Sequence, residues 1–87
     1  MEAEKIARLL DAEKAVVTGI KTSLFRIQEE LANEILKLIE LITPNNSIGY
    51  AIINGESIVF HRGEKTIIAF VDDDKIMGAI RRLSENV

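Results

Sequence analysis

The sequence predicts one domain, residues 1–87, of the α/β (α+β) class. In this domain a five-stranded antiparallel sheet carries two helices on one face and one helix on the other. Three observations support the prediction: helical spacing of apolar residues in three segments, β-branched runs in five others, and an Asn-Gly pair joining two of those runs. The expected order is α-β-β-α-β-β-β-α, and no linker rich in Gly, Ser or Pro divides the chain.

The N-terminal part is expected to form a short helix and two short strands. Ile6, Leu9 and Leu10 lie at helical spacing within residues 2–10. The runs 15–20 and 23–27 are apolar and β-branched and lie on either side of a bend near Gly19, which predicts two paired strands.

The central helix is predicted over residues 29–42. Leu31, Ile35, Leu38 and Ile42 recur at intervals of four, three and four residues, and further apolar residues widen this stripe. Pro44 forbids continuation, so the helix is expected to end near residue 43.

Three strands are predicted to follow, over residues 48–53, 57–61 and 66–71. Asn54 and Gly55 join the first two, and this pair readily supplies the two positive φ values of a type I′ turn. Residues 62–65 are expected to form the second hairpin connection.

The closing helix is indicated by the spacing of Ile76, Met77, Ile80 and Leu83. Asp73 or Asp74 is expected to cap its start, and Arg81 and Arg82 are expected near its negatively polarised end.

The third predicted strand is apolar on both faces, so both faces of the sheet need to be covered by helices. Ile48, Tyr50 and Ile52 point to one face of the sheet, and Ala51 and Ile53 point to the other, so both faces are apolar. Five strands span about 24 Å and packed helices lie roughly 10 Å apart, so each face needs about two helices. With only three helices, the central helix covers one face alone and keeps an unsatisfied apolar flank. A second copy of the chain is therefore predicted to supply the missing cover.

The composition limits the functional classes. A hydrophobic fraction of 47 %, with 14 Ile among 87 residues, favours burial against a partner. The net charge of −3 with interleaved signs argues against a nucleic-acid partner. The absence of Cys favours a reducing, cytoplasmic location, and no apolar run is long enough for a membrane span. The abundance of Glu, Lys, Arg and Ile also suits a thermophilic archaeal or bacterial source.

The sequence offers no set of residues for catalysis, for a cofactor or for a metal. The run Asp72–Asp74 has oxygen ligands suited to Mg²⁺ or Ca²⁺, but the end of a strand followed by a helix cap explains it better. His61 is the sole His, so no His-based metal site or triad is formed within one chain, and it is expected to be an exposed or half-buried strand residue. The serines lack a nucleophile-elbow context. Gly49 is interpreted as a bulge or a close backbone approach, and Gly78 as a tight contact between helix and sheet. We therefore expect a non-enzymatic protein.

The chain resembles the roadblock/LC7 family, small profilin-like modules that include dynein light chains, bacterial gliding-motility regulators and lysosomal scaffold subunits. The segment EKTIIAFVDDD followed by DKIMGAIRRLSE is similar to the final strand of that family, its acidic residues and its last helix, with Gly78 near the start and Arg81 or Arg82 after it. The hairpin IGYAIINGESIVFHR is similar to the family's middle strands.

The resemblance implies a homodimer in which two central helices pack together and two third strands join edge to edge. It also implies that the partner is a small Ras-like GTPase or a larger scaffold assembly. On this chain, the implied dimer interface consists of Leu31, Ile35, Leu38, Ile42, Ile48, Tyr50 and Ile52. Two alternatives from other classes stay open: a small-molecule sensor or regulatory domain of similar architecture, and a non-catalytic subunit of an enzyme complex.

Overall fold

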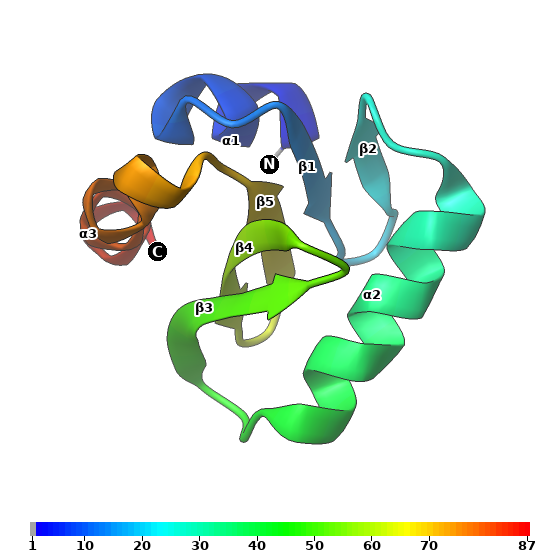
Figure 1. The fold of residues 1–87 in the computed structure, drawn as a ribbon. Coiled ribbons are helices and arrows are strands. Elements are labelled where there is room, and N and C mark those ends of the chain that lie inside the picture. Colours follow the sequence, from blue (N-terminus) through cyan, green and yellow to red (C-terminus); the bar gives the residue numbers. More distant parts are fainter. Residues whose placement is uncertain (1) are drawn as a thin grey trace.

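A computed structural model describes residues 2–87 and contains the eight helices and strands that the sequence predicts, in the predicted order (Figure 1). Within the described residues, no helix combines the length and the apolar character that a membrane crossing requires. The elements are α1 (Ala3–Leu10), β1 (Lys14–Val17), β2 (Ser23–Phe25), α2 (Glu29–Ile42), β3 (Ser47–Ile53), β4 (Glu56–Arg62), β5 (Thr66–Phe70), a 3₁₀ turn η1 (Asp73–Lys75) and α3 (Ile76–Asn86).

The five strands form one antiparallel sheet in the order β2-β1-β5-β4-β3. Helices α1 and α3 lie on one face of this sheet, and α2 crosses the other face, as Figure 1 shows. The predicted α+β arrangement, with two helices on one face of a five-stranded antiparallel sheet and one helix on the other face, is therefore confirmed.

Two apolar clusters, one on each face, form the core. Under α1 and α3, side chains such as Ile6, Leu10 and Leu83 pack against Val59 and Ile67 of the sheet. Under α2, the alternate strand residues meet the helix, because successive side chains of a strand point to opposite faces. This second cluster contains Val16, Ala32, Ile35, Leu36, Ile39, Ile58, Phe60, Ile68 and Phe70.

The first two strands are shorter than predicted. β1 ends at Val17, and Ile20 is fully exposed in the following turn. β2 ends at Phe25, because Arg26 adopts a positive φ of 57°, which no strand accommodates. The Ser23 side chain connects the start of β2 to α1: its Oγ accepts a hydrogen bond of 2.9 Å from the backbone N–H of Ala3.

Helix α2 has the predicted bounds, residues 29–42. Its C-terminal end carries no basic residue of its own, and the compensating cation comes from β4. The Arg62 guanidinium donates hydrogen bonds to the carbonyl oxygen of Glu40, at 2.8 Å, and to that of Thr43. These contacts satisfy carbonyl groups that the helix leaves free, and they fix the end of α2 to the sheet.

The predicted hairpin between β3 and β4 is confirmed. Asn54 and Gly55 have φ values of 52° and 77°, as a type I′ turn requires. The strands pair without interruption from Ser47 opposite Arg62 to Ile53 opposite Glu56, so Gly49 marks no bulge. A side chain at position 49 would instead approach the Phe60 ring at 3.3 Å, which makes Gly49 a place of close approach.

The closing helix differs from the prediction in three details. No side-chain hydrogen bond caps η1 or α3, because the Asp73 carboxylate accepts a hydrogen bond from the buried Ser57 hydroxyl instead. Arg81 and Arg82 lie near the middle of α3, which continues to residue 86. A Cβ at Gly78 would meet no atom within 4 Å, so this glycine makes no tight contact.

An ion pair connects the end of α1 to the start of α3. The Lys75 ammonium lies 2.6 Å from the Asp11 carboxylate. Its hydrogen bond and charge lower the pKa of Asp11, and Asp11 raises the pKa of Lys75 in return. The contribution of this pair to stability is therefore lost as the pH falls through the lowered pKa of Asp11, below 3.8, and as it rises through the raised pKa of Lys75, above 10.5.

Two glycine-to-alanine substitutions are predicted to change stability in opposite directions. Gly55→Ala should destabilise the domain by about 1 kcal/mol, because φ is positive there. Gly78→Ala should stabilise it by about 0.5–1 kcal/mol, because this exchange lies within α3 and meets open space. Urea unfolding measures both, and shifts of the same sign would contradict the two backbone assignments.

Candidate protein interaction surface

Strand β3 forms one rim of the sheet and has the features of an unprotected edge. It has seven residues, SIGYAII, without a charge or a proline, and within residues 2–87 only β4 pairs with it. Edge strands of monomeric proteins are usually short, charged, bulged or covered, because a free row of backbone N–H and C=O groups pairs readily with another chain. The opposite edge strand, β2, has only three residues. The edge open to strand pairing is therefore β3.

The three predicted interface residues of β3 lie together on the face that carries α1 and α3. Ile48, Tyr50 and Ile52 are paired with residues of β4 that include Val59, a member of the core beneath those two helices. All three are exposed, with 54 % of Tyr50 and 66 % of Ile52 accessible to solvent. The β3 side chains that lack cover thus lie on the sheet face that carries two helices, whereas incomplete cover was expected on the face of the central helix. The reason is that α1 packs mainly against β1 and β2, and α3, although it contacts both β4 and β3, leaves these three side chains exposed.

The predicted stripe on α2 is divided between the core and the surface. Ile35 is 4 % exposed and belongs to the core, so its assignment to a surface needs correction, and Leu31 is half-buried at the margin of that core. Leu38 and Ile42 are exposed and form an apolar flank of α2. The sequence also predicted this unsatisfied flank. Leu41, 82 % exposed, was missed as a surface residue.

The acidic run at the end of β5 lines a surface hollow of about 430 Å³. Two of the three carboxylates of the run are already engaged, since Asp73 accepts a hydrogen bond from Ser57 and Asp72 lies 3.7 Å from Lys75. Among residues 2–87, no three His, Cys, Asp or Glu side chains are grouped so that they could hold a metal ion. The run serves the junction between β5 and α3.

His61 and Ser57 both lie on β4, and each is at least partly buried. His61 is half-buried on β4, as predicted, and its Nδ1 is buried without a hydrogen-bond partner in the described part of the chain. Ser57 is buried and donates to Asp73.

The fold and this surface define a small α+β domain with helices on both faces of an antiparallel sheet and one open sheet edge. The chain is 30 % identical to a protein of Archaeoglobus fulgidus that is described only as uncharacterized, over 98 % of this chain and 95 % of that protein. It belongs to the same family as this archaeal protein. No protein-family model matches the sequence, and no solved structure is a significant match.

The division of the α2 stripe leads to a direct test. Ile35→Ala should destabilise the domain by about 2–5 kcal/mol, because it leaves a cavity against the sheet. Leu41→Ala should change the unfolding free energy by less than about 0.5 kcal/mol, because the side chain is in solvent. Thermal or urea unfolding at matched protein concentration compares them, and equal losses would refute the burial assigned to the two positions.

Proposed function

We propose that this chain is a non-enzymatic homodimeric scaffold or regulator that binds a small Ras-like GTPase or a larger complex. The observation that supports this proposal most is the exposed strand β3, which is uncharged and seven residues long. A second copy of the same strand offers a matching length and the same lack of charge.

The alternation of β3 limits how two copies can pair. In an antiparallel pair, directly opposed side chains lie on the same face of the sheet. A twofold axis at Tyr50 would set Ile48 of one copy opposite Ile52 of the other, and the two tyrosines opposite each other. This register joins the two exposed rows into one apolar surface and extends the sheet to about ten strands.

The same pairing brings both α2 helices to one face of the joined sheet. Figure 1 shows that the C-terminal end of α2 turns directly into β3, so this end lies close to the rim. The exposed flank formed by Leu38 and Ile42, with Leu31 at its margin, is then available to the corresponding flank of the other copy. Burial of these side chains at about 25 cal/mol per Å² supplies the driving force.

The proposed partner, a Ras-like GTPase, rests on the resemblance to the roadblock/LC7 family. The αββαβββα order and the layer arrangement of the described chain are compatible with it. A rigid dimer provides a broad surface that can bias the switch loops of a GTPase by binding one nucleotide state more tightly, with no catalytic group of its own.

The dimer is predicted to depend on Leu38 and not on its neighbour Leu41. Leu38→Glu should give a folded monomer, because Leu38 borders solvent in one subunit whereas a buried unpaired charge in the interface costs about 3–5 kcal/mol. Leu41→Glu, the matched control, should keep the dimer. Sedimentation equilibrium at two concentrations measures both, with circular dichroism as the check on folding. A monomeric wild type would refute the proposed dimer, and a dimer indifferent to Leu38→Glu would place the interface elsewhere.

Binding to a GTPase is predicted to depend on the bound nucleotide. Ras-like GTPases encoded in the source genome should show at least about a fivefold difference in Kd between GDP and a GTP analogue, equal to about 1 kcal/mol of differential affinity. Calorimetry with the purified wild-type protein measures it. Failure of every such GTPase to bind, or equal affinity in both states, would refute the regulatory role.

A further inference from the structure

Helix α3 runs along β4, beside the open rim of the sheet. The Asp73 carboxylate, just before this helix, accepts a hydrogen bond from Ser57 at one end of β4. Asn86, at the other end of the helix, lines a hollow together with His61 near the far end of the same strand. Strand β4 pairs with β3 over this whole length and α3 contacts both strands, so the helix also extends along the exposed row of β3.

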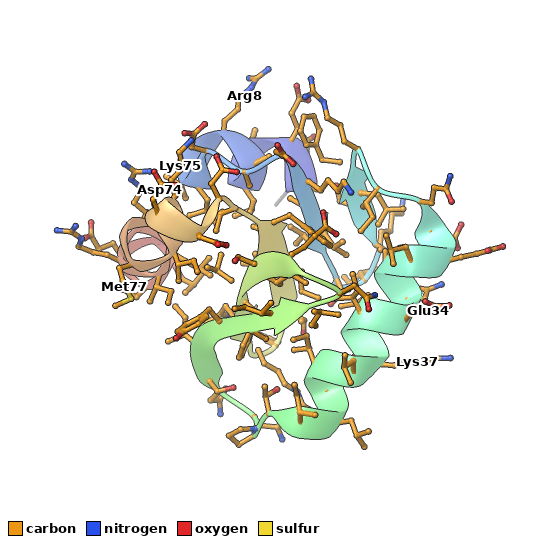
Figure 2. All side chains as sticks on the ribbon, in the orientation of Figure 1. Arg8, Glu34, Lys37, Asp74, Lys75 and Met77 are labelled. Atoms are coloured by element: carbon orange, nitrogen blue, oxygen red, sulfur yellow. The ribbon has the colours of Figure 1, made fainter. Side chains whose placement is uncertain are left out.

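One flank of α3 faces that row. Lys75, at the start of the helix, pairs with Asp11 on the α1 side. Met77 is 71 % exposed and points away from α1 in Figure 2, toward the side on which β3 lies. With 3.6 residues per turn, Ile80 and Ser84 lie on the same flank as Met77, and we call these three residues the inner flank of α3.

The spacing of the strands decides what can cover this surface. In the proposed dimer the two β3 strands lie side by side, and each α3 lies above its own β4 and β3. At about 4.8 Å per strand, the axes of the two α3 helices are then roughly 10–14 Å apart. A further helix between them would need about 16–20 Å, because packed helices lie 8–10 Å apart. A helix from another protein therefore does not fit, whereas the two α3 helices are within reach of each other's side chains.

We infer that α3 of the second copy covers the exposed row of β3, so that the two inner flanks pack against each other. The inference rests on the proposed function, because it adds a contact to the proposed homodimer. Tyr50 lies opposite the middle of the part of β4 that α3 follows, so a twofold axis there makes the two α3 helices antiparallel, with their middle turns adjacent. Ile80 of each copy then meets its counterpart, and Met77 of one copy meets the smaller Ser84 of the other.

The charges and the exposed area of these surfaces favour a second copy. The inner flank has no charged side chain, so two copies of it meet without like-charge repulsion. Met77 and the three side chains of the β3 row, of about 200 Å² each and more than half exposed on average, leave roughly 450 Å² of surface per copy. A stable interface of standard size buries about 800 Å² per partner. The α3 and β3 contacts on one face and the α2 flank on the other together approach this size.

Cysteine cross-linking tests the contact, because the chain has no cysteine of its own. Chains with Met77→Cys, mixed with chains with Ser84→Cys, should be joined into covalent dimers by a short bismaleimide. A mixture of Gly78→Cys and Glu85→Cys chains is the matched control, with the same spacing of seven residues but about 100° away around the helix. It should cross-link about tenfold more slowly. Equal rates for the two mixtures, or no cross-linking of the first, would overturn the inference.

Substitution by glutamate gives an independent measure of the same contact. Met77→Glu should raise the Kd of the dimer at least about tenfold, whereas Leu41→Glu, the same kind of change outside the contact, should alter it less than about twofold. Both residues are exposed in one subunit, so circular dichroism should show both variants folded. Sedimentation separates the two proposals. A monomeric wild type refutes the dimer and this contact with it, whereas a stable dimer that is indifferent to Met77→Glu overturns only the contact between the α3 helices.

Discussion

Strand β3 ends the sheet with one row of unpaired backbone N–H and C=O groups, and three large apolar side chains stand beside that row. An unpaired edge of this length attracts another strand, because water satisfies its polar groups but leaves the apolar side chains exposed. Neither of the neighbouring helices covers these side chains, since they stay exposed although α3 contacts β3, and α2 lies on the opposite face. A second copy of the chain meets both requirements, backbone pairing and apolar cover, with one contact.

The rest of the domain holds this rim in place. Arg62 binds the carbonyl groups at the end of α2, so the helix and the strand that follows it keep a fixed relation. The type I′ turn at Asn54 and Gly55 sets the register of β3 on β4, which decides which side chains face α3. The exposed rows of α2 and β3 are therefore presented by rigid elements, as a recognition surface requires.

Local patterns predicted much of this arrangement. The spacing of apolar residues and Pro44 gave both ends of α2, and Asn54-Gly55 gave the hairpin, because each depends on residues near in sequence. The same spacing showed which residues of α2 share a stripe but not which part of it is buried. Ile35 lies inside and Leu41 outside because the sheet residues that meet α2 come from β1, β4 and β5, which are distant in sequence. Ile20 was misassigned because β propensity is a weak guide outside its packing context, and this residue lies exposed beyond the end of β1.

Hydrogen exchange along β3 measures the central claim most directly. One set of alternate amides in this strand faces β4, and the other set faces the rim. If a second copy pairs there, the rim-facing amides become protected as the protein concentration rises through the dimer Kd, while the amides facing β4 are protected throughout. Rim-facing amides that exchange as fast as unstructured ones at every concentration would contradict the account.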